Sequence, residues 1–223
     1  MTSRKCWLVG SAALALALFV LLGVGFARHW HWLESADGFG FDALHSYGVA
    51  HPGWVTFWDV LCTVLGPTMF RLLALAAIVV FLVRRNLRAA LFLVITVELS
   101  GFVSEAAKAA ANRPRPAEAL VYASSTSFPS GHALGVMVGV LALSTLVLPF
   151  VRKPGRIWLI VVGAVVVVAV GVGRVMLNVH HFSDVLAGWA LGYAWFAVCA
   201  LLVTPVAPIK AADETPAAHG NSR

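Results

Sequence analysis

Long apolar stretches alternate with short polar segments along most of the chain. A helix that crosses a bilayer needs about 20 mostly apolar residues, and an open sheet cannot satisfy its backbone hydrogen bonds in lipid. Six stretches approach or exceed that length: residues 6–27, 67–83, 89–107, 132–151, 157–173 and 183–203. The pattern therefore predicts an all-α integral membrane bundle of six transmembrane helices.

Three segments interrupt or follow this pattern. The second stretch is preceded by apolar residues from Trp54 onward but is broken at Gly66 and Pro67, which predicts a short interfacial segment before the span. Residues 28–52 mix Trp, His and acidic residues with glycines, a composition typical of the headgroup layer. Residues 208–223 are polar and rich in Ala and Pro, which predicts a disordered cytoplasmic tail.

Composition supports a membrane protein with one domain. Of the 223 residues, 60% are hydrophobic and 12% are charged, whereas soluble domains average about 45–50% and about 25%. A chain of this length suits a single membrane domain, which we assign to residues 1–207. Residues 6–27 exceed the apolar core of about 7–15 residues found in cleavable signal peptides, so we expect a retained anchor.

Basic residues cluster at the ends of the apolar stretches, as membrane topology requires, so the net charge of +6 does not indicate nucleic-acid binding. With six spans, four clusters fall on one side: Arg4 and Lys5; Arg84, Arg85 and Arg88; Arg152, Lys153 and Arg156; and Lys210. The positive-inside rule makes that side the cytoplasm, with both termini. The compact architecture favours a bacterial inner membrane. No feature of the sequence fixes an oligomeric state.

Three polar motifs fall on the opposite side of the predicted bundle. They are Lys108-Ala-Ala-Ala-Asn-Arg113-Pro-Arg115-Pro, then Ser127-Phe-Pro-Ser130-Gly131-His132, then Arg174 followed by His180 and Asp184. They contain four of the five basic residues that break the positive-inside pattern, and Arg28 is the fifth. Because the topology was deduced from other residues, this agreement indicates one shared functional site.

The residue types in these motifs suit phosphoryl transfer. Lys108, Arg115 and Arg174 would gather three cations, which stabilise the equatorial oxygens of a transferring phosphoryl group. Ser130 and Gly131 precede a predicted helix start, where backbone N–H groups, a hydroxyl and the helix dipole favour an anion. Glycine also lets the backbone approach such a ligand closely.

Two histidines and one carboxylate provide the chemistry. His180 and Asp184 lie one helical turn apart, so the carboxylate can hold one ring nitrogen while the other acts as nucleophile. His132, from a different span, can act as general acid toward the leaving oxygen. No cluster of carboxylates, or of His and Cys, has the spacing of metal ligands, so we expect neither a metal nor another cofactor.

The order Lys-x6-Arg-Pro, Pro-Ser-Gly-His and Arg-x5-His-x3-Asp resembles the type 2 phosphatidic acid phosphatase family, whose superfamily also contains acid phosphatases and vanadium haloperoxidases. The resemblance covers about residues 54–203. It implies that the phosphate is bound by Lys108, Arg115, Ser130, Gly131 and Arg174. It also implies that His180 forms a phosphohistidine, that Asp184 orients it and that His132 protonates the leaving group. The family usually has Ser where this chain has Gly173, which removes one minor hydrogen bond.

Motifs and resemblance together predict a metal-independent phosphatase acting on a lipid phosphate or diphosphate at the outer membrane face. Candidate substrates are undecaprenyl diphosphate, phosphatidylglycerophosphate and phosphatidic acid. A phosphotransferase on the same scaffold would share the first half-reaction, so the catalytic residues do not separate the two. A non-catalytic lipid-binding or transport protein is the alternative from another class.

Several polar residues outside the motifs allow more than one interpretation. Glu98 and Glu105 share a helical face and could be structural partners of Arg71 or Lys108, or could line a substrate channel. Arg113 could assist phosphate binding or contact headgroups at the surface. His181 is expected to have a packing or interfacial role. The histidines between residues 29 and 51 are irregularly spaced, which favours loop and interface positions over a metal site.

Overall fold

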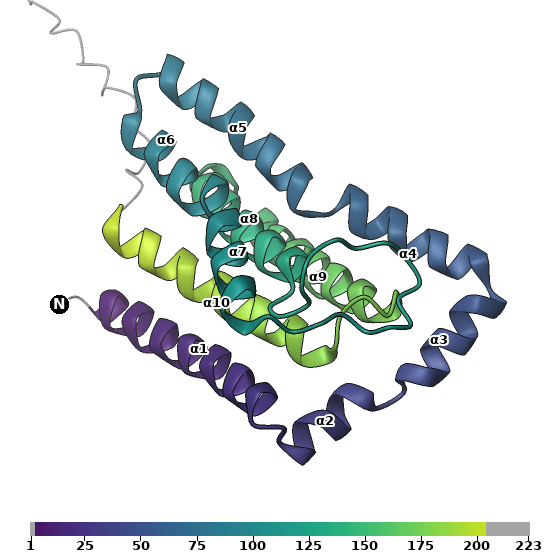
Figure 1. The fold of residues 1–223 in the computed structure, drawn as a ribbon. Coiled ribbons are helices and arrows are strands. Elements are labelled where there is room, and N and C mark those ends of the chain that lie inside the picture. The colour runs from purple at the N-terminus through teal and green to yellow at the C-terminus, as the bar shows by residue number, and fades with distance from the viewer. Residues whose placement is uncertain (1–2, 204–223) are drawn as a thin grey trace, which may run out of the picture.

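The computed structural model describes residues 3–203, and within that range the chain is helical and contains no strand. The helices are α1 (Ser3–Ala27), α2 (His31–Gly38), α3 (Phe41–Ala50), α4 (Pro52–Val64), α5 (Pro67–Val83), α6 (Leu87–Leu93), α7 (Ser100–Ala111), α8 (Gly131–Val147), α9 (Lys153–Met176) and α10 (Phe182–Leu202). Figure 1 shows them as a bundle of long helices closed at one end by α2, α3 and a long loop. The predicted all-α bundle is therefore confirmed. The predicted disordered tail, residues 208–223, lies outside the described residues.

Within the described range, six segments are long and apolar enough to cross a bilayer: Lys5–Ala27, Pro52–Val83, Leu87–Ala111, Gly131–Phe150, Lys153–Met176 and Phe182–Leu202. Four of them contain a stretch predicted from the sequence, and the other two, Gly131–Phe150 and Phe182–Leu202, end one residue before the predicted stretches 132–151 and 183–203. The predicted break in the second is present, because α4 ends at Val64 and α5 begins at Pro67. The missing N–H of proline is tolerated at this position, where a helix begins.

The mixed segment 28–52 forms structure that the apolar pattern did not predict. It contains α2 and α3, which connect the end of α1 to the start of α4. Gly40 separates these two short helices and has φ of 71°, in the left-handed region that glycine adopts without strain. The two helices lie across the end of the bundle where the functional motifs meet (Figure 1).

Helices α8 and α10 pack closely in the centre of the bundle because glycines face their neighbour. A Cβ on Gly188 would lie 2.6 Å from the carbonyl oxygen of Ser130, and one on Gly192 would lie 2.8 Å from that of Leu134. Small residues let membrane helices approach in this way. The contact brings the start of α8 against the start of α10, which is where the second and third motifs lie.

The third span is not a regular α-helix. Its hydrogen bonding shifts to a π-helical turn over Val94–Glu98, between α6 and α7, and the backbone N–H of Leu99 bonds to the carbonyl of Val94 at 3.1 Å. Such turns occur often at functional sites. Nothing in the apolar pattern predicted this turn, whose last residue, Glu98, lines a cavity described below.

Candidate active site

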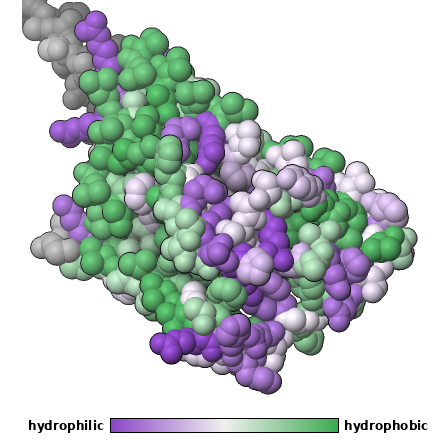
Figure 2. Space-filling model, viewed as in Figure 1, coloured by the Kyte–Doolittle hydropathy of each residue, from purple (hydrophilic) through white to green (hydrophobic). Residues whose placement is uncertain are grey.

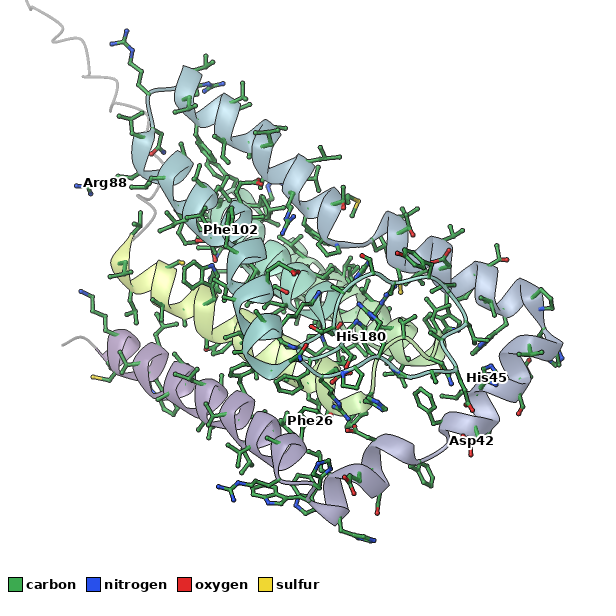
Figure 3. All side chains as sticks on the ribbon, in the orientation of Figure 1. Phe26, Asp42, His45, Arg88, Phe102 and His180 are labelled. Carbon is green, nitrogen blue, oxygen red and sulfur yellow. The ribbon has the colours of Figure 1, made fainter. Side chains whose placement is uncertain are left out.

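The three motifs meet at one end of the bundle. Lys108 lies at the end of α7, the second motif begins α8, and Arg174 lies near the end of α9. Figure 3 shows His180 at the centre of this region under the loop of residues 112–130, whereas Arg88 projects from the opposite end of the molecule. The fold therefore gathers the predicted site residues at a single place.

His180 is 1% exposed and lies between a carboxylate and a guanidinium. Its Nδ1 is 3.5 Å from Oδ2 of Asp184, and its Nε2 is 3.2 Å from Nη1 of Arg115. Among the described residues Nδ1 has no closer hydrogen-bonding partner. Burial lowers the pKa of His180 to about 4, against the opposing attraction of Asp184, so the ring is neutral near pH 7.

The His180–Asp184 pair is built differently from the prediction. We expected both residues on one helix, but α10 begins at Phe182 and only Asp184 lies in its first turn. The carboxylate instead reaches back to the preceding segment, where its Oδ2 also accepts the backbone N–H of His181 at 2.9 Å. Asp184 thus stabilises the start of the helix with the same oxygen that faces Nδ1 of His180.

Arg113 holds the other oxygen of Asp184. Its Nη1 donates to Oδ1 of Asp184 at 2.7 Å, and its Nη2 donates to Oδ2 of Asp37 at 2.8 Å. The guanidinium is buried and lies 4.6 Å from the centre of the Phe26 ring. Both interpretations offered for Arg113, a phosphate ligand or a headgroup contact, were wrong because two carboxylates occupy its donors.

Asp37 is a member of this network that the sequence analysis missed. It lies on α2, is 5% exposed, and accepts hydrogen bonds from the backbone N–H of Ser183 at 2.9 Å and from its hydroxyl at 2.7 Å. Asp37 and Ser183 are separated by 146 positions in the sequence. The one available signal was an acidic side chain in a Trp-rich segment, which is not specific.

The predicted cations Lys108, Arg115 and Arg174 surround the other side of His180. Lys108 Nζ donates to the hydroxyl of Ser125 at 2.7 Å, and Arg115 Nη1 donates to the carbonyl of Val179 at 2.7 Å. The Nε of Arg174 is buried and has no partner within residues 3–203. The charges of Arg115 and Arg174 both act on the His180 ring. These cations therefore retain N–H groups that could donate hydrogen bonds to an anion.

The start of α8 differs in detail from the anion site that was predicted. The backbone N–H of Ser130 is not free, because it donates to the carbonyl of Asp184 at 2.9 Å. The Ser130 hydroxyl caps the helix by accepting the N–H of Ala133 at 3.5 Å. Within the described part of the chain, the N–H groups of Gly131 and His132 have no acceptor. These two groups, rather than that of Ser130, are available to a ligand.

Gly131 and His132 connect the cations to a cavity of about 430 Å³ that both residues line. A Cβ on Gly131 would lie 3.2 Å from Oγ of Ser104 and 3.5 Å from Nζ of Lys108, so the glycine leaves room for the ammonium group. His132 is close enough to His180 for the two rings to interact electrostatically. The structure thus brings all eight predicted site residues together.

Other residues discussed from the sequence have clear environments. His181 stacks on Phe41 with ring centres 5.4 Å apart, in agreement with a packing role. Glu105 forms an ion pair with Lys108 at 3.2 Å. Gly173 fits a close contact, since a Cβ there would lie 2.6 Å from Sγ of Cys62 and 2.9 Å from the Trp58 ring. Within residues 3–203, no three His, Cys, Asp or Glu side chains are grouped to hold a metal ion.

A family model described as the PAP2 superfamily matches residues 89–206, which include all three motifs. The chain belongs to the PAP2 superfamily. This finding confirms the family resemblance drawn from Lys108 to Asp184.

Curated relatives within the superfamily match the chain over part of their length. A phosphatidylglycerophosphatase B of Bacillus subtilis (strain 168) is 40% identical over 80 residues, which is 34% of this chain and 39% of that protein. An undecaprenyl-diphosphatase of Sulfolobus acidocaldarius is 34% identical over 88 residues, 40% of this chain and 38% of that protein. The matched segments thus span about two fifths of the length of these relatives.

A solved structure matches the fold much more completely. The transmembrane PAP2-type phosphatidylglycerolphosphate phosphatase from Bacillus subtilis superimposes with a TM-score of 0.72, at 25% identity, over 90% of this chain and 99% of that one. With six apolar helices of sufficient length within residues 3–203, this PAP2 chain is an integral membrane protein.

Proposed function

We propose that this protein is a lipid phosphatase that hydrolyses a phosphomonoester or diphosphate through a phosphohistidine on His180, without a metal. The observation that carries the proposal is the environment of His180. Its ring is buried and neutral, Asp184 lies at Nδ1, and Nε2 lies on the side of the cations. A neutral imidazole held in one orientation beside cations is suited to attack a phosphorus atom.

In the first step, the Nε2 lone pair of His180 forms a bond to phosphorus while the bond from phosphorus to the leaving oxygen breaks. Asp184 stabilises the positive charge that develops on the ring and keeps the proton on Nδ1. Lys108, Arg115 and Arg174 stabilise the charge on the equatorial oxygens. His132 donates a proton to the leaving oxygen, so the lipid product departs as a hydroxyl or a monophosphate.

In the second step, His132 is neutral and accepts a proton from water as the water oxygen attacks the phosphohistidine. The bond from phosphorus to Nε2 breaks, and inorganic phosphate leaves. A phosphotransferase would use an acceptor lipid in place of water, with the same residues. No observation on this chain favours that alternative.

The charge distribution supports an active site at the outer face, with both termini in the cytoplasm. Arg88 lies at the opposite end of the bundle from His180 (Figure 3). Arg84 and Arg85 belong to the same connection as Arg88, and Arg152 precedes α9 at its end remote from Arg174. Clusters of this kind mark the cytoplasmic side. The two similar proteins from Bacillus subtilis favour a bacterial inner (plasma) membrane as the location.

The names of the relatives suggest the substrate class. One is a phosphatidylglycerophosphatase and the other an undecaprenyl-diphosphatase, so phosphatidylglycerophosphate and undecaprenyl diphosphate are the first candidates, with phosphatidic acid as a third. The cavity beside His132 lies between spans, which would let a head group reach the cations while its chains stay in lipid.

The test is phosphate release by the purified protein from these three lipids, with excess chelator present. We expect release from at least one lipid by the wild type and none above background by His180→Ala. His181→Ala is the matched control, because the neighbouring ring packs on Phe41 and should leave release measurable. Trapping of ³²P on the wild type, but not on His180→Ala, would identify the intermediate. Unchanged release by His180→Ala would overturn the proposal.

A further inference from the structure

The cavity that reaches His132 continues away from the catalytic cations toward the middle of the membrane. It lies between α5, α7 and α8, and its lining includes Arg71, Glu98, Ser104, Gly131 and His132. Figure 2 shows a streak of hydrophilic residues that extends from the more polar end of the molecule, where the loop of residues 112–130 lies, into the mainly hydrophobic part of this face. Polar groups at this depth are costly and usually serve a function.

Several polar groups along this cavity have no partner in the protein. Ser104 is 5% exposed and its Oγ makes no hydrogen bond with any described residue. Oε1 of Glu98, at the end of the π-helical turn, also makes no hydrogen bond with any described residue. Arg71 forms no ion pair within the described range. A buried polar atom without a partner is destabilising, so Oγ of Ser104 and Oε1 of Glu98 indicate a ligand, and the exposed side chain of Arg71 is free to contact it.

Arg71 has space made for it inside the cavity. Its terminal Nη2 lies directly against Gly101 on α7, where any Cβ would collide with it. Gly101 and Lys108 are two turns apart on the same face of α7, which is about 10 Å along the axis at about 1.5 Å per residue. Lys108 Nζ lies 3.2 Å from Oε1 of Glu105, one turn earlier on the side toward Gly101.

His132 lines the same cavity as Arg71. On the proposed mechanism it protonates the leaving oxygen, so the part of the cavity beyond it receives the leaving group. When phosphatidic acid is the substrate, the leaving group is a neutral alcohol. It carries no negative charge that Arg71 could bind. The leaving group of a lipid diphosphate, or of phosphatidylglycerophosphate, carries a second phosphate. A guanidinium is well suited to bind that group.

We infer that Arg71 and Ser104 form a subsite for a second phosphate on the leaving group, so that the enzyme favours lipids with two phosphates over lipids with one. The inference rests on the proposed phosphatase function. Arg71 and the Ser104 hydroxyl would donate to the phosphate oxygens. Glu98 would be the nearby negative charge that holds Arg71 in the cavity before substrate arrives.

The test compares lipids that share their chains. The first pair is dioleoyl phosphatidylglycerophosphate and dioleoyl phosphatidic acid, and the second is farnesyl diphosphate and farnesyl monophosphate. For each pair we define a selectivity ratio, kcat/KM for the two-phosphate lipid divided by kcat/KM for the other. Arg71→Gln should lower this ratio about tenfold or more, because it removes a charge-assisted contact. Arg71→Lys retains the cation and should keep the ratio within about threefold of wild type.

The matched control is Arg84→Gln, at the other end of α5, which changes net charge equally without reaching the cavity. A fall of the selectivity ratio in only one of the two lipid pairs would support the subsite. It would also show whether the subsite accepts two phosphates that are linked directly or two that are bridged by glycerol. Equal losses on all four lipids would overturn it in favour of a structural role. If wild-type protein released phosphate from none of them, the proposed function would fail instead.

Native mass spectrometry of His180→Ala, with and without Arg71→Gln, then tests lipid binding itself. Equal binding by both proteins overturns the subsite.

Discussion

Both sides of the His180 ring contain charged residues. On one side each charge is paired with an opposite charge, and on the other side most of the positive charge is unpaired. Behind the ring, Arg113, Asp37, Ser183 and Asp184 form a buried network in which each charged group meets an opposite charge. In front of it, Arg115 and Arg174 form no ion pair with any described residue, and Lys108 is paired only with the exposed Glu105. The first arrangement fixes the geometry of the protein, and the second can bind an anion.

Arg113 and Arg115 show the difference most directly because only Pro114 separates them. Arg113 donates to two carboxylates, so its charge is neutralised within the protein. Arg115 donates to the carbonyl groups of Ser125 and Val179, which leave its charge uncompensated. Whether an arginine in this motif can bind a ligand therefore depends on the groups to which its guanidinium donates. The residue type and the motif alone do not reveal this.

The largest effect expected from this comparison is on stability, at Arg113. Arg113→Gln would leave Asp37 and Asp184 as buried carboxylates without their cation, and we expect a loss of about 3–5 kcal/mol. Thermal unfolding in detergent measures the change. The double variant Arg113→Gln with Asp37→Asn should recover part of the loss. A single variant as stable as wild type would show that the network does not support the fold.

Arg115→Gln should have the next largest effect, on catalysis. Loss of a cation that stabilises transition-state oxygens costs about 2.7–4 kcal/mol, so kcat/KM should fall about 10²–10³-fold. The melting temperature should change much less than for Arg113→Gln, since no carboxylate is left unpaired. Steady-state kinetics and thermal unfolding on the same preparations provide both values. A variant that unfolds like Arg113→Gln while retaining activity would reverse the assignment of the two arginines.

The smallest effect concerns pH. Burial lowers the pKa of His180 to about 4, with Asp184 opposing the shift, so the neutral form persists as pH falls from 7 to 5. At pH 5 only about one tenth of the rings should be protonated, and protonation should become dominant only below about pH 4. NMR titration of ¹⁵N-histidine-labelled protein measures this without substrate, and His180→Ala assigns the signal. A midpoint near 6.5 would mean that the ring is solvated.

Much of the fold could be predicted because it depends on local composition. Apolar stretches of sufficient length predicted each span, and the break at Gly66 and Pro67 was visible because proline begins helices readily. Helices α2 and α3 were missed because their mixed residues resemble a headgroup-layer loop. The π-helical turn was missed because hydrogen-bond register leaves no trace in an apolar pattern.

The site was predictable where its residues lie in short motifs and not where they meet through the fold. The motifs containing His132, His180 and Asp184 were recognised because their spacing is specific. Asp37 was missed because it contacts Arg113 and Ser183 only when α2 crosses the end of the bundle. The backbone N–H of Ser130 was wrongly considered free because its acceptor, the carbonyl of Asp184, belongs to a distant helix.

The contact at Gly173 makes the residue before the motif arginine depend on a different helix. A Ser at this position would carry a Cβ within 3 Å of both Cys62 and Trp58 on α4. Gly173→Ser would therefore force both side chains to move, and the shift would be transmitted to Arg174, the next residue of the site. The glycine thus ties the position of a catalytic cation to the packing of α4 against α9.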